Sequence, residues 1–178
     1  MMEAIPGGFD NTGQVEPVAG RASILHQYLE NARKKPRTQA ARDMRVLLVD
    51  DDVESIIPMH LTLAGLGCEI TIAFNGQSAI DHLIRKPFDL VILDWLMPDL
   101  SGADVLKMSQ NIIAKDKTIT KNWKMPTLPF VTYSGVSFKE VEIPNCSNFD
   151  FVGHWQKPIS LNKLSFLTTE IVSWLNKR

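Results

Sequence analysis

Residues 89–102 read Asp-Leu-Val-Ile-Leu-Asp-Trp-Leu-Met-Pro-Asp-Leu-Ser-Gly. The apolar run from Leu90 to Leu93 has the length and composition of a fully buried strand. Asp94 follows this run at once and precedes the mostly apolar sequence Trp-Leu-Met-Pro, which is a poor setting for an acid that is merely solvated. The stretch therefore predicts a strand at 89–93 that carries a functional acid at its carboxyl end.

Short apolar runs recur on both sides of this strand and alternate with amphipathic segments. They predict strands at 45–49, 69–73, 89–93, 128–133 and 149–153, and helices at 53–66, 77–85, 103–114 and 161–176. In the last helix, the inward-facing side chains are expected to be Leu164, Leu167, Ile171, Trp174 and Leu175. The alternation is typical of an α/β fold with a parallel sheet flanked by helices. A fourth helix, within 135–147, is expected to be short or absent, because this segment has a glycine, a proline and little periodicity.

Residues 44–178 are expected to form this domain, and residues 1–43 an N-terminal extension. Residues 1–20 are rich in Pro, Gly, Asn and Gln and predict a mobile tail. Residues 22–32 carry Ile24, Leu25, Tyr28 and Leu29 at helical spacing and predict a short amphipathic helix. The basic segment that follows is interpreted as a solvated linker, with an acidic partner as the alternative.

The composition excludes several classes of protein. With 19 basic and 20 acidic side chains, the formal net charge is -1, which does not favour nucleic-acid binding. The apolar runs are too short to span a bilayer, and the first residues lack the pattern of a secretory signal. We therefore expect a soluble, cytoplasmic protein without a membrane partner. The two cysteines, Cys68 and Cys146, are expected to be free thiols.

Polar residues follow the predicted strands at their carboxyl ends, where ligands bind in open parallel sheets. These residues are Asp50, Asp51 and Asp52 after the first strand, Asp94 after the third, Ser134 after the fourth, and Lys157 after the fifth. Clustered carboxylates are tolerated mainly when a hard cation neutralises them, and magnesium is the natural candidate. A carboxylate can also attack phosphorus, and an ammonium and a hydroxyl can then stabilise the phosphoryl oxygens. Asp52 alone is expected to cap the following helix.

The assembled motifs resemble the response-regulator receiver family of two-component signalling. They are Val-Leu-Leu-Val-Asp-Asp-Asp at 46–52, the stretch at 89–102, the segment from Pro129 to Gly135, and Lys157-Pro158. The resemblance covers about 44–177. It implies a doubly wound, five-stranded parallel sheet in the flavodoxin-like order 2-1-3-4-5.

The resemblance also assigns roles by position. It makes Asp94 the phosphoacceptor and Asp50 and Asp51 the metal-binding acids, with Asp94 and the backbone carbonyl of Leu96 completing the protein ligands to magnesium. Ser134, rather than Thr132, falls on the hydroxyl position, and Lys157 falls on the lysine that contacts the phosphoryl group. Leu96 and Val136 occupy positions that often influence attack of water on the acyl phosphate. Neither can orient a water, so slow self-dephosphorylation is expected.

Three features depart from the family pattern. Residues 111–125 form a longer, basic connection that could be specific to a partner. His154 stands where an aromatic switch residue is often found, and it is either a buried structural histidine or a switch. The fourth helix, which usually belongs to the signalling face, is poorly specified, so the output surface is an open question.

The leading hypothesis is a phosphoacceptor switch, not an enzyme. It would receive its phosphoryl group from a sensor histidine kinase or a phosphotransfer protein and act on an unidentified protein target, with a homodimer left open. The chain is either a stand-alone regulator or a fragment of a longer regulator or hybrid kinase. One alternative is a degenerate receiver that only binds protein. Another is a phosphatase of the haloacid dehalogenase type, which is disfavoured because Glu54 stands where that family has Thr or Val.

Overall fold

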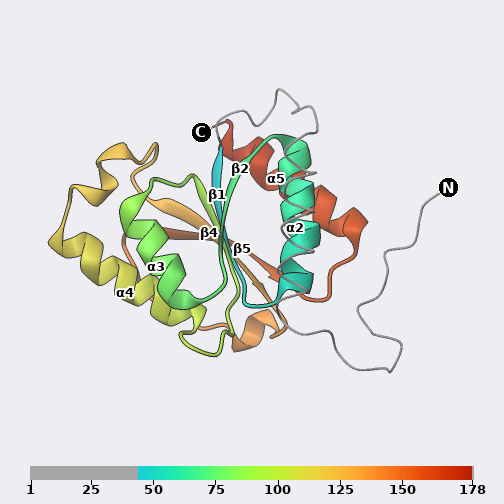
Figure 1. Cartoon of the computed structure of the whole chain (residues 1–178), viewed down its shortest axis with the longest axis horizontal. Coiled ribbons are helices and arrows are strands. Elements are labelled where there is room, and N and C mark those ends of the chain that lie inside the picture. Colours follow the sequence, from blue (N-terminus) through green and yellow to red (C-terminus); the bar gives the residue numbers. More distant parts are fainter. Residues whose placement is uncertain (1–43, 178) are drawn as a thin grey trace.

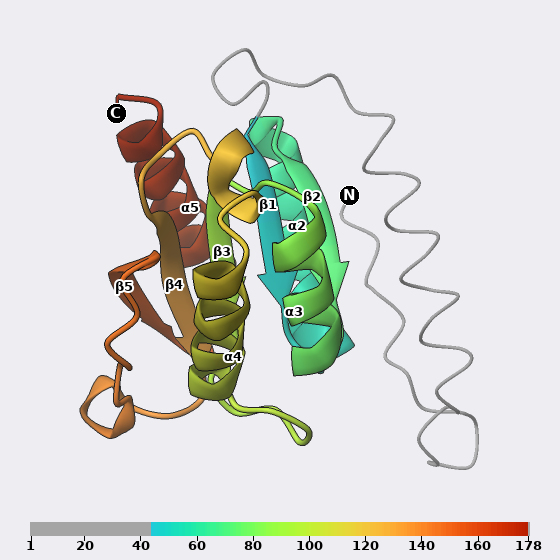
Figure 2. The same cartoon turned by 90° about the vertical axis from the view of Figure 1, so that its left-hand side faces the viewer.

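The computed structural model describes residues 44–177, so the expected tail at 1–20 and helix at 22–32 lie outside the described residues. Five parallel strands form one sheet (Figure 1), and Figure 2 shows their order, β2-β1-β3-β4-β5. The strands are β1 (Arg45–Val49), β2 (Glu69–Ala73), β3 (Leu90–Leu93), β4 (Leu128–Ser134) and β5 (Phe149–Gln156). This order confirms the expected fold class.

Helices cover both faces of the sheet. Helices α3 (Gly76–Arg85) and α4 (Gly102–Lys115) pack on one face, and α2 (Val53–Leu66) and α5 (Leu161–Leu175) pack on the other (Figures 1 and 2). Two short 3-10 helices, η2 (Ile119–Asn122) and η3 (Phe138–Glu140), lie in the connections before and after β4. The observed elements agree with the predicted ones in kind and order, although β5 continues past the expected end at Gly153.

The central strands β1 and β3 are buried on both faces, which explains why their sequences read as continuous apolar runs. Leu47 and Val91 pack under α3 and α4, whereas Leu48 and Ile92 pack under α2 and α5, and all four are fully buried. Side chains alternate between the two faces along each strand, so a run without polar residues fills both cores.

Local signals place the ends of the helices. Asp52 caps α2, because its carboxylate accepts hydrogen bonds from the backbone N–H of Glu54 at 3.0 Å and from the Ser55 hydroxyl at 2.9 Å. Ser160 caps α5 in the same way, and Gly67 ends α2 in the left-handed conformation with φ of 96°. The predicted capping role of Asp52 is thus confirmed.

The inward face of α5 differs from the predicted one. Its buried side chains are Leu164, Thr168, Val172 and Leu175, while Leu167, Ile171 and Trp174 are only partly buried. Thr168 is tolerated in the core because its hydroxyl donates to the carbonyl of Leu164 at 2.8 Å. A pattern based on apolar residues alone could not identify this threonine as the centre of the buried stripe.

The connection from β4 to β5 contains no α-helix, as expected from its sequence. It holds only the short η3, and it covers the sheet by packing Val136, Val141, Ile143 and Cys146 against the core. Phe138 stacks on Phe151 of β5 with ring centroids 5.7 Å apart, although 54% of Phe138 is exposed. Apolar residues in the loop therefore take the place of a helix on this part of the sheet.

None of the helices within residues 44–177 has the length and apolar character needed to cross a bilayer.

Asp89 ties the amino ends of two strands together. Its carboxylate accepts hydrogen bonds from the side chain of Arg45 at 3.1 and 3.2 Å and from the Arg45 backbone at 2.8 Å, and Lys124 lies 3.3 Å away. Burial acts to raise the pKa of Asp89, but the hydrogen bonds and charge of Arg45, with the charge of Lys124, outweigh it and hold the pKa below its usual value. Lys124 thus anchors the end of the 111–125 connection to the sheet.

Replacing Asp89 with asparagine is expected to lower the free energy of unfolding by about 1.5 to 3 kcal/mol, because charged hydrogen bonds to a buried carboxylate are lost. Since the pKa of Asp89 is lower in the folded chain, its contribution is present above the unfolded pKa of about 3.9 and disappears as the pH falls through the folded pKa. Urea unfolding from pH 7 down to pH 3 measures this. If the difference in free energy of unfolding between wild type and Asp89→Asn grew as the pH fell, the stabilising role of the ionised Asp89 would be contradicted.

Candidate functional site

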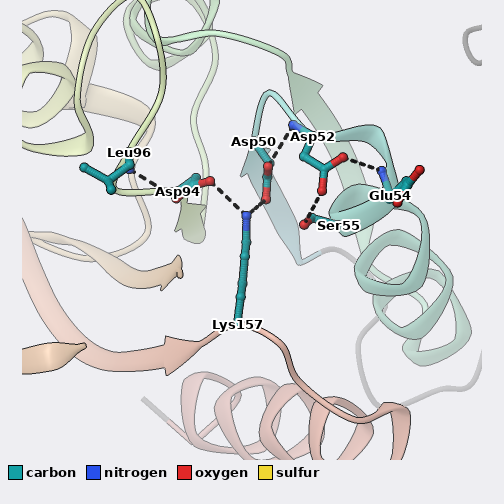
Figure 3. Close-up of polar contacts among 7 residues, drawn as sticks. All are labelled: Asp50, Asp52, Glu54, Ser55, Asp94, Leu96 and Lys157. Atoms are coloured by element: carbon teal, nitrogen blue, oxygen red, sulfur yellow. Dashed lines mark hydrogen bonds and ion pairs between the residues drawn. The ribbon is translucent and has the colours of Figure 1, made fainter. Parts of the chain in front are cut away.

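Three of the predicted site residues, Asp50, Asp94 and Lys157, meet at the carboxyl ends of the strands (Figure 3). Asp50 directly follows β1, and Asp94 directly follows β3. The backbone N–H of Asp94 donates to the carbonyl of Val49 at 2.8 Å, and that of Asp50 donates to the carbonyl of Ala73 at 3.1 Å. These bonds continue the strand pairing, so the sheet itself holds the two acids side by side. The exposed fraction is 0% for Asp50 and 6% for Asp94.

Lys157 joins the two buried acids. Its Nζ lies 2.6 Å from Oδ2 of Asp50 and 2.8 Å from Oδ2 of Asp94, and Figure 3 shows the side chain extending between them. The backbone N–H of Lys157 donates to the carbonyl of Ser134 at 2.8 Å, which fixes the start of this side chain against the end of β4. Its ammonium also lies 4.8 Å from the ring centroid of Tyr133. Sequence reasoning had not identified Tyr133 as part of this site.

The remaining carboxylate oxygens accept hydrogen bonds from the backbone. Oδ1 of Asp50 accepts from the N–H of Asp52 at 2.9 Å, and Oδ1 of Asp94 accepts from the N–H of Leu96 at 3.2 Å (Figure 3). Each acid is therefore oriented by one backbone donor and by Lys157.

Burial affects the pKa of Asp50 more than its hydrogen-bond partners do. It raises the pKa of Asp50 to about 6, although the hydrogen bond and charge of Lys157 and the backbone bond from Asp52 act in the opposite direction. Burial also acts to lower the pKa of Lys157, but its hydrogen bonds to Asp50 and Asp94 outweigh this and the net shift is upward. The site thus keeps a charged lysine beside a carboxylate that is costly to ionise.

Three carboxylates are placed as a metal site requires. Oxygen atoms of Asp50, Asp51 and Asp94 all lie within 4.8 Å of one another, with Asp51 exposed and the other two buried. Carboxylate oxygens are the ligands that magnesium prefers, and an exposed side leaves room for its waters. The donor set therefore fits the expected cation. Leu96 lies two residues after Asp94 in the chain. The use of its backbone carbonyl as a ligand to magnesium stays a prediction.

The two candidate hydroxyls of β4 have different surroundings. Oγ1 of Thr132 lies 2.7 Å from Nδ1 of His154, its partner across the β4–β5 pair. Ser134 ends β4 and is 1% exposed, and its hydroxyl has no hydrogen-bond partner among the described residues. Within residues 44–177, the serine hydroxyl is thus buried without a partner, whereas the threonine hydroxyl is engaged. The assignment of Ser134, rather than Thr132, to the hydroxyl position stays a prediction.

His154 lies away from the acids, on the other side of Thr132. It is partly buried, and its ring centroid lies 5.8 Å from that of Phe138. Its Nε2 has no hydrogen-bond partner in the described part of the chain. The structure therefore connects this histidine to β4 and to the β4–β5 loop, and its use as a switch stays a prediction.

Gly102 is required by the close approach of α4 to the site. A Cβ at this position would lie 2.8 Å from the carbonyl oxygen of Asp94 and 2.7 Å from the ring of Trp95. The N–H of Gly102 donates to the carbonyl of Trp95 at 3.0 Å. The last residue of the stretch at 89–102 thus lets the loop after Asp94 close tightly.

Residues 46–165 match the family model for the response regulator receiver domain. The chain belongs to this family. Over 128 residues it is 29% identical to the transcriptional regulatory protein ZraR of Klebsiella oxytoca, which covers 72% of this chain and 26% of that protein. Over 72 residues it is 35% identical to the sensor histidine kinase GacS of Pseudomonas protegens, covering 40% of this chain and 8% of that protein. This receiver chain therefore spans about a quarter or less of these two curated relatives.

Solved receiver domains share the fold. One is the receiver domain of a sensor histidine kinase from Pseudomonas aeruginosa, which has a magnesium ion coordinated in its active site cleft. It aligns with a TM-score of 0.53 at 19% identity and covers 72% of this chain and 97% of that chain. At this level of identity the likeness concerns the fold alone.

Proposed function

We propose that this receiver domain is a phosphoacceptor switch in which Asp94 accepts a phosphoryl group from a phosphohistidine on a sensor histidine kinase or phosphotransfer protein. The observation that carries the proposal is the contact of Lys157 with both Asp50 and Asp94 at the carboxyl edge of the sheet. A structural ion pair would need only one acid. Two buried acids that share one cation, beside an exposed third acid, form a site for a further cation and an incoming anion.

Each side chain has a distinct part in the transfer. An oxygen of the Asp94 carboxylate forms a bond to phosphorus, the bond from phosphorus to the histidine nitrogen breaks, and its electron pair stays on the imidazole. The ammonium of Lys157, 2.8 Å from Asp94, can donate to a phosphoryl oxygen, and so can the unpartnered hydroxyl of Ser134. Asp50, Asp51 and Asp94 would hold magnesium, which supplies positive charge to the phosphoryl oxygens when bound. Phosphorylation would then change the affinity for a downstream protein.

The alternative functions have less support from the geometry. A phosphatase of the haloacid dehalogenase type needs the acid two positions after its nucleophile, which here would be Asp52 after Asp50. That carboxylate caps α2 and is occupied by Glu54 and Ser55. A degenerate receiver, acting only by protein binding, would have no need of a Lys157 that contacts both Asp50 and Asp94.

Incubation with acetyl phosphate and magnesium tests the proposed function. The full chain is expected to gain the mass of one phosphoryl group in intact mass spectrometry, and the gain should disappear when EDTA removes the metal. Peptide mapping should place the group on the segment that contains Asp94. An unchanged mass at saturating acetyl phosphate, or a phosphoryl group on another segment, would refute the proposal.

The acyl phosphate is expected to be long-lived, with a half-life of minutes or more in magnesium. Leu96 is 59% exposed near the site and Val136 is partly buried, and neither side chain can orient a water for attack. Decay of the phosphorylated mass after removal of acetyl phosphate measures the half-life. Leu96→Asn, which introduces a polar group at the exposed position, is expected to shorten it. Decay of the wild type within seconds would contradict this reading.

A further inference from the structure

A groove of about 520 Å³ lies between β5 and the second half of α5, away from the acidic site. Within residues 44–177, strand β5 is an edge of the sheet and pairs only with β4 (Figure 2). The groove is lined by apolar side chains and by two acids, among them Asp150, Trp155, Leu167, Glu170, Ile171 and Trp174.

The groove exists because the buried stripe of α5 is centred on Thr168 rather than on its apolar neighbours. Leu167, Ile171 and Trp174 therefore lie on the flank of the helix, beside β5, and stay partly exposed. A flank with three large apolar side chains next to an edge strand is typical of a surface that another segment covers.

We propose that the chain's own residues 22–32 occupy this groove as an amphipathic helix. Their sequence places Ile24, Leu25, Tyr28 and Leu29 on one helical face, which would pack on the apolar flank of α5. Residues 22–32 lie outside the described part of the chain. The proposal is supported by their sequence, by the lining of the groove and by residues 33–43, the tether that links this segment to β1.

The tether is long enough to connect the start of β1 with a helix bound in the groove. The strand register aligns Leu47 with Val91, Val91 with Phe130, and Phe130 with Phe151, so Phe151 lies three strand spacings, about 14 Å, from β1. Residues 33–43 can span about 36 Å when extended. The chain also enters β1 at the amino edge of the sheet, which is the edge where Asp150 of the groove lies. A short tether of this kind gives a high local concentration of the segment.

The charges of the tether and of the groove are complementary, which favours residues 22–32 as the occupant. The residues that follow the predicted helix include Arg33, Lys34, Lys35 and Arg37, whereas the charged residues of the groove are Asp150 and Glu170. The distant end of α4 and its connection instead carry Lys115, Lys117 and Lys121, all exposed. Like charges there disfavour the basic tether, so the β5–α5 groove is the better match.

A spin label on the full chain tests the proposal. Ser23→Cys introduces a site for a nitroxide on the polar face of the predicted helix. The natural thiols react slowly, because Cys68 and Cys146 are buried and burial raises the pKa of both, to about 11 for Cys68. The readout is the intensity of isoleucine methyl signals with the nitroxide oxidised and then reduced.

The methyl signal of Ile171 is expected to lose most of its intensity in the oxidised state, while that of Ile80, in α3 on the other face of the sheet, is expected to keep it. Leu25→Asp combined with Leu29→Asp should restore the Ile171 signal. The control pair His26→Asp and Gln27→Asp adds acids to the polar face and should leave the loss unchanged.

Three results would overturn the proposal. The first is an Ile171 signal that the wild-type label does not affect. The second is a loss that survives the Leu25 and Leu29 substitutions. The third comes from mixing a spin-labelled, unenriched chain with an isotope-enriched chain that has no label, because a loss at Ile171 in this sample would make a second copy the occupant.

Discussion

Replacing Asp94 with asparagine is expected to abolish phosphorylation by acetyl phosphate. The amide has no carboxylate oxygen to form an acyl phosphate, and the backbone donor from Leu96 and the sheet contacts of the residue do not depend on its charge. Intact mass spectrometry in magnesium measures the result, with the wild type gaining one phosphoryl group and the variant none.

Asp52→Asn provides the matched control for this variant. Asp52 lies in the same acidic run, but it is exposed and its carboxylate caps α2. Asparagine is also a good N-cap, so this variant is expected to fold and to take up a phosphoryl group as the wild type does. Phosphorylation of Asp94→Asn at the wild-type level would assign the acceptor role to another residue.

Replacing Lys157 with methionine is expected to reduce the free energy of unfolding by about 3 to 5 kcal/mol, because it leaves two buried acids without their shared cation. The lysine side chain is 17% exposed and Asp50 is fully buried, so solvent cannot replace the lost charge. Phosphorylation is expected to slow by about a hundredfold, since one donor to the phosphoryl oxygens is removed.

Urea unfolding with and without magnesium distinguishes the effect of losing the Lys157 charge from the effect of losing its packing. Because a bound cation would neutralise the same acids, magnesium is expected to stabilise Lys157→Met more than the wild type in urea unfolding. Lys163→Met removes the same charge from an exposed position of α5 and should change neither stability nor phosphorylation. Equal free energies of unfolding for Lys157→Met and Lys163→Met would show that the contacts of Lys157 with Asp50 and Asp94 do not stabilise the fold.

The sequence alone determined the kind and order of the elements, because these depend on local properties. A short apolar run such as Leu90 to Leu93 has the length of a strand that is covered on both sides, and the caps at Asp52 and Ser160 act within one helical turn. It also placed Asp50, Asp94 and Lys157 at one edge, because parallel strands all end at the same edge of a sheet.

Only the tertiary structure decided how these residues meet. Lys157 contacts Asp50 across 107 positions of sequence, and the pairing of Thr132 with His154 depends on the register between β4 and β5. The buried stripe of α5 likewise depends on how that helix rotates against the sheet, which is why the stripe centres on Thr168 and leaves the flank beside β5 uncovered. Periodicity reports which residues are apolar, whereas contacts between distant elements set which of them are buried.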